Sequence, residues 1–194
     1  EMLEKIKHHP TASTFLWGTS LLLPQYMPFG LVPIKNLTDT EFPEADKFGG
    51  RSYRPRLELK RHPCWACQFH HCNIVKIMEG PYSGYVAEEP EFEDLVAFGP
   101  LIGQTDPQAV IVLTDLNDRL GMDVNEIGWL LAMLMECYAK GIITRKDIDG
   151  IDLTWGNVEA VRSILPKIAR REGFGHILAE GTMRAAELIG GEAP

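Results

Sequence analysis

The stretch DVNEIGWLLAMLMECYAKG, from Asp123 to Gly141, predicts a long amphipathic helix. Asp123 is a suitable N-cap, and Glu126 three residues later completes the pattern of a capping box. One face of the helix carries apolar side chains at helical spacing, namely Ile127, Leu130, Leu131, Leu134 and Tyr138. Gly141 is a suitable stop because glycine adopts the left-handed conformation without strain. Helical patterns of this kind are therefore expected to dominate the second half of the chain.

Three further helical patterns flank this segment. Asp106 and Pro107 are an N-cap and a first-turn proline, and they predict a helix that ends near Gly121. Two more patterns follow, over residues 157–173 and 181–189. Strand signals are sparse, so the fold is predicted to be mainly α.

The first half of the chain is less regular. Residues 1–60 mix short helical stretches with a proline-rich region, and residues 61–104 hold a cysteine cluster and an acidic segment. We therefore expect two parts. Residues 1–104 form a helical and irregular segment with a cysteine-rich loop, and residues 105–194 form a multi-helix domain.

Composition limits the classes of function. The formal net charge of -8 argues against binding to nucleic acid or to an anionic membrane surface. The longest apolar stretch, residues 15–34, is interrupted by three prolines, so we expect no membrane span. Of the four cysteines, three are clustered, which is typical of metal-binding thiolates in a reducing cytoplasm rather than of a disulfide scaffold.

The cysteine cluster lies in HPCWACQFHHC, residues 62–72. Cys64, Cys67 and Cys72 form a C-x2-C-x4-C pattern, which brings several sulfur donors to one face of a loop. Tetrahedral zinc and a [4Fe–4S] cluster both take four ligands, so one ligand is missing from this set. The spacing does not decide between the two metals.

The fourth ligand has several candidates. A histidine would favour zinc, and three lie within the stretch, at His62, His70 and His71. The remaining cysteine, Cys137, lies within the predicted helix beside its apolar face, where a buried core thiol is the more common role.

Two more elements offer polar groups to a ligand. In NDRLGMDV, residues 117–124, Asp118 lies at a helix C-terminus, where the helix dipole disfavours a carboxylate. It is either a solvated side chain or an acceptor for donor groups of a heterocyclic ligand. The acids of EEPEFED, residues 88–94, have two possible roles. Either they form a solvated face, or one glutamate enters a buried helix, where desolvation would raise its pKa and suit it to proton transfer.

Taken together, these elements resemble the tungsten-containing aldehyde:ferredoxin oxidoreductase family. The resemblance rests on their order along the chain. The matching stretches are HPTASTFLWGT, CWACQFHHC, EPEFEDL, NDRLGMDV, GIITRKDIDGIDLTWG and KIARREGFGHILAEGTMRAAELIG. They cover essentially the whole sequence.

The resemblance implies a larger multidomain oxidoreductase. In this family an N-terminal β domain, absent here, and two helical domains hold a bis-pterin tungsten or molybdenum cofactor beside a [4Fe–4S] cluster. By the match, Cys64, Cys67 and Cys72 are cluster ligands, and the fourth cysteine belongs to a later element beyond Pro194. The chain is thus expected to be a fragment, inactive by itself. The family spacing before the last cysteine is x3, whereas it is x4 here.

The resemblance also assigns roles to the two polar elements. The family's DxxGLD element hydrogen-bonds a pterin, which implies cofactor binding by Asp118, Gly121, Met122 and Asp123, with Met122 in place of the usual leucine. A glutamate of the acid–aromatic–acid element acts as acid or base. Glu93 is the first candidate for this role and Glu91 the second.

The implied activity is oxidation of an aldehyde to a carboxylic acid in an anaerobic cytoplasm. Electrons would pass through the cluster to ferredoxin or another redox subunit. An aromatic acyl-CoA reductase or a non-catalytic subunit of the same family is an alternative. A zinc-binding helical interaction module is an alternative of another class.

Overall fold

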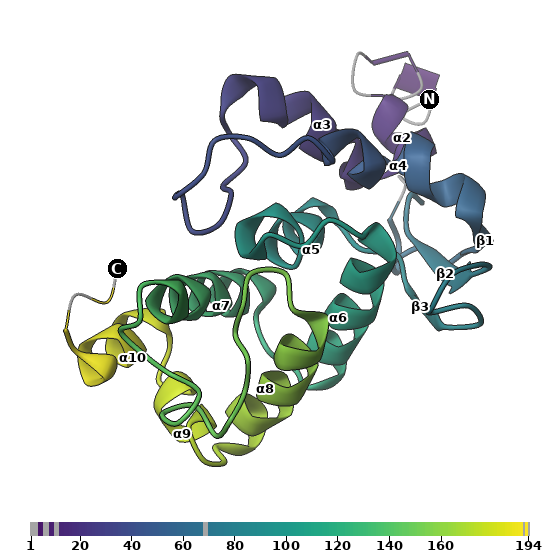
Figure 1. The fold of residues 1–194 in the computed structure, drawn as a ribbon. Helices are drawn as coiled ribbons and strands as arrows, with labels where there is room; N and C mark the ends of the chain where they lie inside the picture. The colour runs from purple at the N-terminus through teal and green to yellow at the C-terminus, as the bar shows by residue number, and fades with distance from the viewer. Residues whose placement is uncertain (1–3, 6–7, 10–11, 68–69, 192, 194) are drawn as a thin grey trace.

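The computed structural model describes residues 4–5, 8–9, 12–67, 70–191 and 193. Over these residues the chain is mainly α with one small sheet, which confirms the predicted fold class. Figure 1 shows the three strands at one edge of the molecule beside α6, with α8 on the other side of α6 and α10 at the far end. Among the described helices, none is long and apolar enough to cross a membrane.

Short helical turns form much of the N-terminal part. Those described, with η marking a 3-10 helix, are α2 (Ser13–Trp17), η1 (Thr19–Leu21), α3 (Leu22–Tyr26), η2 (Met27–Phe29), η3 (Ala45–Phe48), α4 (Gly50–Tyr53) and η4 (Arg54–Arg56). Prolines lie in α3, η2 and η4, which agrees with the short length of these elements because proline cannot donate a helical hydrogen bond.

A three-stranded antiparallel sheet follows, and the sequence did not reveal it. Its strands are β1 (Leu57–Arg61), β2 (Asn73–Ile77) and β3 (Val86–Glu88), in the order β1-β2-β3. Val75 lies opposite Leu59 on one side and Ala87 on the other. One face packs on α6 through a small apolar cluster of Val75, Ile77, Ala87, Ile111 and Val112. The cysteine-rich stretch is the connection between β1 and β2, so the sheet sets where the cysteines lie.

Helices form the rest of the chain. They are α5 (Phe92–Ala97), η5 (Pro100–Ile102), α6 (Pro107–Arg119), α7 (Val124–Ala139), α8 (Val158–Arg170), α9 (Gly175–Leu178) and α10 (Thr182–Ile189). The predicted caps are confirmed, because Asp106 accepts the Gln108 backbone N–H at 2.9 Å and Asp123 accepts that of Glu126 at 2.8 Å. The capping box predicted with Glu126 is not formed, because the Glu126 carboxylate accepts the backbone N–H of Thr182 and thereby joins α7 to the start of α10.

The main core surrounds α7. Ten consecutive or nearly consecutive residues of this helix are buried, between Ile127 and Cys137. The apolar side chains among them join one cluster with Phe48 and Leu95 from the N-terminal part and Leu165 from α8. Buried side chains from both sides of residue 104 therefore share this cluster, and the boundary expected there stays a prediction.

Close approach of α5 to α7 depends on Gly128. A Cβ at this position would lie 2.6 Å from the Cβ of Ala97, which is closer than real carbon atoms approach. We expect Gly128→Ala to push the helices apart and lower the free energy of unfolding by about 1–3 kcal/mol. Urea denaturation measures this change. Asn125→Ala is the control, because Asn125 lies on the exposed first turn of α7, and it should leave the free energy of unfolding nearly unchanged. An equal loss of stability in both variants would contradict the role of close packing at Gly128.

Candidate metal centre and cofactor-binding elements

The cysteine loop is closed at its base like a β-hairpin. The His62 backbone N–H donates to the Cys72 carbonyl at 3.0 Å, which extends the pairing of β1 with β2. At the tip, the Cys67 N–H donates to the Cys64 carbonyl at 3.0 Å in a turn where Ala66 has a left-handed φ of 59°. The Sγ atoms of Cys64 and Cys72 lie 3.8 Å apart. The loop therefore gathers two sulfur donors, with Cys67 on the same turn.

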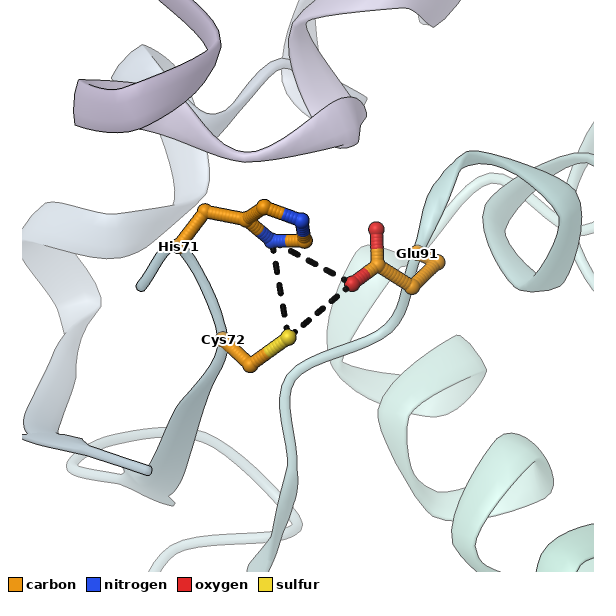
Figure 2. A group of neighbouring side chains, drawn as sticks. All are labelled: His71, Cys72 and Glu91. Atoms are coloured by element: carbon orange, nitrogen blue, oxygen red, sulfur yellow. Dashed lines mark hydrogen bonds and ion pairs between the residues drawn. The ribbon is translucent and has the colours of Figure 1, made fainter. Parts of the chain in front are cut away.

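Glu91 faces this loop from the opposite side, as Figure 2 shows. Its Oε1 lies 3.4 Å from the Cys72 Sγ and 3.4 Å from the His71 Nδ1. The His71 Nδ1 is in turn 3.5 Å from the Cys72 Sγ. These three side chains can each offer one ligand atom to the same ion. Of the three histidines near the cysteines, His71 is thus the one whose ring nitrogen contacts a cysteine sulfur in the described structure.

Glu91 is held by its place at the start of α5. It is the N-cap residue, and its side chain accepts the backbone N–H of Asp94. The Asp94 Oδ2 accepts the Glu91 N–H at 2.9 Å, so the two acids form a complete capping box. The local pattern E-F-E-D therefore directs Glu91 backward over the helix N-terminus rather than outward to solvent.

A buried ion pair brings Glu91 and the loop together. Arg54 donates from Nε and Nη2 to the two carboxylate oxygens of Glu89, at 2.6 and 2.9 Å. Tyr53 donates its hydroxyl to Glu89 at 2.7 Å, and Asn73 donates its side-chain amide to the same carboxylate. The Arg54 and Glu89 side chains are only 6% and 5% exposed. Asn73 directly follows Cys72, and Glu89 lies two residues before Glu91, so this network fixes both sides of the site.

The buried network shifts the pKa of one of its members, Tyr53. Burial, together with the charge of Glu89, raises the pKa of Tyr53 well above its ordinary value. The tyrosine is therefore a neutral hydrogen-bond donor throughout the physiological range.

The Cys72 thiol is protonated when no metal is bound. Burial raises the pKa of Cys72 to about 12, and the Cys64 thiol and the Glu91 carboxylate add to this effect. Metals bind the thiolate, so metal binding at this loop requires that a cation displace the proton.

The other predicted residues of these segments lie elsewhere. Glu93 is exposed and lines a groove with Phe92, Val96 and Trp129, whereas the cysteines do not line that groove. Cys137 is completely buried in α7, with its Sγ 3.7 Å from the Met133 sulfur, as a core thiol would be. The structure therefore brings Glu91, and not Glu93, to the cysteine loop.

The predicted pterin-contacting element is the connection between α6 and α7. Gly121 has a left-handed φ of 71°, which turns the chain after α6. Asn117, which sequence reasoning missed, is fully buried and donates its amide to the Met122 carbonyl at 2.8 Å. Asp118 is exposed, while partial desolvation and the charges of Glu88 and Asp115 raise its pKa. Asn117 thus holds the loop, and Asp118 presents a carboxylate at its start.

The start of α5 and the end of α6 influence each other electrostatically. Burial raises the pKa of Asp94 to about 6, and the negative charges of Asp118, Glu91 and Glu93 also raise it. The hydrogen bond from the Glu91 N–H opposes this shift. The cysteine side and the predicted pterin side of the molecule are therefore linked through Asp94.

Comparison with known proteins identifies the family. The family model described as "Aldehyde ferredoxin oxidoreductase, domains 2 & 3" matches residues 1–194. The chain belongs to the aldehyde ferredoxin oxidoreductase family. This confirms the resemblance seen in the sequence motifs.

Relatives of this chain include two proteins named tungsten-containing aldehyde ferredoxin oxidoreductase. The one from Pyrococcus furiosus is 35% identical over 193 residues, which cover 98% of this chain and 31% of the relative. The one from Thermococcus kodakarensis is 32% identical with the same coverage. A third relative, the aliphatic sulfonate oxidoreductase, WOR-like subunit, of Pyrococcus furiosus, is 33% identical over 160 residues, or 81% of this chain and 25% of the relative. The chain spans at most about a third of these proteins.

A solved structure shares the fold of this family member. It is titled "Active site complex BamBC of Benzoyl Coenzyme A reductase in complex with 1,5 Dienoyl-CoA". The TM-score is 0.70 at 19% identity, over 91% of this chain and 26% of the solved one. At this identity the likeness shows a common fold.

Removal of one partner of the buried ion pair should strongly destabilise this protein. We expect Arg54→Met to lower the free energy of unfolding by about 3–5 kcal/mol, because it leaves the Glu89 carboxylate buried without its countercharge. Chemical denaturation measures the loss. Arg56→Met is the control, since Arg56 and Glu79 form an exposed pair with a 3.4 Å Nε–Oε1 distance, and its loss should be under about 1 kcal/mol. Similar losses in both variants would contradict the role of burial.

Asp94 should make stability depend on pH. Its pKa of about 6 in the folded state exceeds the ordinary value of 3.8, so the folded state favours the protonated acid. The stabilisation is fully present below the unfolded pKa and is lost as pH rises from about 4 to 6.

Asp94→Asn keeps an acceptor for the Glu91 N–H but does not ionise. We expect the variant to gain about 1–3 kcal/mol relative to the natural protein between pH 4 and pH 7. Urea denaturation at both pH values measures the change. If the difference in stability between Asp94→Asn and the natural protein is the same at pH 4 and pH 7, Asp94 is not the titrating group.

Proposed function

We propose that this chain is part of a tungsten- or molybdenum-dependent oxidoreductase that converts an aldehyde to a carboxylic acid. The observation that carries the proposal is the meeting of the cysteine loop with Glu91 in a chain that matches its family model from end to end. Several relatives are named for tungsten and for aldehyde oxidation. The balanced reaction consumes one water per aldehyde and releases two protons and two electrons.

The residues present fit a [4Fe–4S] cluster by their chemistry. Cys64, Cys67 and Cys72 would be its ligands, because iron–sulfur clusters are held by cysteine thiolates and all three lie on the one loop between β1 and β2. We propose that the fourth thiolate comes from another part of the polypeptide. When bound, the cluster and the metal–pterin group supply the electron-accepting chemistry, and ferredoxin or another redox subunit takes up the electrons.

The α6–α7 connection would hold a pterin. The Asp118 carboxylate lies at the exposed end of α6, where it can accept hydrogen bonds from the ring N–H and amino group of such a heterocycle. Gly121 and Met122 form the turn beside it, which Asn117 holds in place. Asp123 caps α7 with one carboxylate oxygen, so its main role would be to fix the end of this turn.

Glu91 is our first candidate for the acid or base, and Glu93 becomes the second. The Glu91 carboxylate lies against a proposed cluster ligand, whereas Glu93 lines a separate groove. In this role Glu91 would take up or release a proton at Oε1 or Oε2, close to the centre that accepts electrons.

The substrate class and compartment belong to the same proposal. All four cysteines are free thiols in the structure, which suits a reducing, anaerobic cytoplasm. An acyl-CoA reductase or a non-catalytic family subunit remains a competing proposal, since the benzoyl coenzyme A reductase complex has the same fold. We favour an aldehyde because four relatives above 30% identity carry that name, whereas one, at 33%, is named for an aliphatic sulfonate.

A single zinc ion is the second candidate occupant. The 3.8 Å between the sulfurs of Cys64 and Cys72 equals the edge of a tetrahedron with bonds of about 2.3 Å, and His71 lies beside Cys72. This geometry would make the loop a structural zinc site in a helical interaction module.

Metal analysis of the intact, anaerobically purified protein separates these candidates. We expect about four irons per chain and a low-potential [4Fe–4S] EPR signal on reduction. Cys72→Ser should lower the iron content and change or abolish the signal, because it removes a ligand. Cys137→Ala is the matched control, since that thiol lies in the core, and it should keep both. Stoichiometric zinc without iron would overturn the cluster and support the zinc module.

A further inference from the structure

The Thr19 hydroxyl links the N-terminal turns to Glu91 across 72 residues of sequence. Thr19 is the first residue of η1, and its Oγ1 donates to the Glu91 Oε2. The same oxygen accepts the backbone N–H of Phe92, the first residue of α5, at 2.9 Å. A hydroxyl has one proton and two lone pairs, so accepting from Phe92 leaves its proton for the carboxylate.

This hydrogen bond, together with the Asp94 backbone N–H that the same side chain accepts, determines how the Glu91 carboxylate is turned. Thr19 binds Oε2, and Oε1 then faces the His71 Nδ1 and the Cys72 Sγ, each at 3.4 Å. The Glu91 side chain is about one-third exposed, so burial alone does not immobilise it. The orientation of the carboxylate thus depends on two donors, the local Asp94 N–H and the hydroxyl of a distant segment.

The backbone conformation at Gly18 brings Thr19 close to α5. Gly18 has φ 70° and ψ -172°, a conformation that side chains disfavour, and it turns the chain from α2 into η1. A Cβ at Gly18 would also lie 3.1 Å from the Arg54 Nη2. Glycine therefore lets the turn lie against the buried ion pair, with the Thr19 hydroxyl directed at α5.

We infer that Thr19 is a positioning residue that aims the Glu91 carboxylate at Cys72. The inference rests on the proposed function, because it gives Thr19 an effect on the reaction only through Glu91. It adds a residue that the sequence motifs alone did not single out for a role.

Thr19→Val tests the inference because valine keeps the shape of threonine and removes the hydroxyl. We expect kcat of the cofactor-loaded protein to fall by about 10–100-fold, as is typical when a side chain that orients a metal-site residue is lost. The EPR spectrum of the reduced cluster should also change, since the carboxylate beside Cys72 moves. Thr19→Ser keeps the hydroxyl and should restore both properties.

Ser20→Ala is the matched control. It removes a hydroxyl from the next residue, which donates to the Trp17 carbonyl at 2.8 Å rather than to Glu91. We expect it to lower the melting temperature without changing the cluster spectrum or kcat. If Thr19→Val does not fold, Thr19→Ala is compared with Thr19→Ser in the same way. An identical loss with Ser20→Ala and Thr19→Val would overturn the inference in favour of a purely structural role.

Glu91→Gln separates failure of the inference from failure of the proposed function. If Thr19 acts through Glu91, the double variant should be no more impaired than Glu91→Gln alone. If Thr19→Val keeps the natural kcat and EPR spectrum while Glu91→Gln is impaired, the inference is overturned and the proposed function stands. A fully active Glu91→Gln would refute the proposed role of Glu91 itself, and the inference would fall with it.

Discussion

The buried ion pair between Arg54 and Glu89 is the constraint on which the arrangement of the site depends. Two charged groups that are both almost fully buried are tolerated only when they are paired and hydrogen-bonded, and here Tyr53 and Asn73 supply the additional donors. Such a pair costs desolvation and contributes more to geometry than to net stability. Its geometry is what matters here. Asn73 adjoins Cys72 and Glu89 lies close to Glu91, so one network sets the distance between a thiol and a carboxylate that belong to different elements.

The helical half of the chain gives this arrangement a rigid support. α7 is buried along most of its length, and α5, which begins at Phe92, packs closely on it at Gly128. α6 packs on the sheet through Ile111 and Val112 and carries Asp118 near its C-terminus. The N-terminus of α5 thus stands between the cysteine loop and the proposed pterin loop. Asp94 at that terminus is influenced by acids from both sides, which makes the two proposed cofactor elements parts of one electrostatic environment.

Particular residues show how far sequence reasoning reaches. Asp106 and Asp123 were recognisable as caps because a cap depends on only the next two or three residues, and the helices follow as predicted. The sheet was missed because β1 is almost entirely exposed and β3 has three residues, so neither has a clear apolar alternation. The choice between Glu91 and Glu93 was also beyond the local pattern. The two residues are equivalent as acids beside Phe92, and only the N-cap conformation at Glu91 distinguishes them.

The sequence by itself determined the helices of the second half, the gathering of three cysteines in one loop, and the family, because these follow from spacing, capping residues and motif order over short distances. The tertiary structure alone decided which carboxylate meets Cys72 and which hydroxyl holds it. Arg54 and Glu89 are 35 residues apart, and Thr19 and Glu91 are 72. Contacts over such separations arise from the packing of whole elements, and a single sequence carries no periodic signal for them.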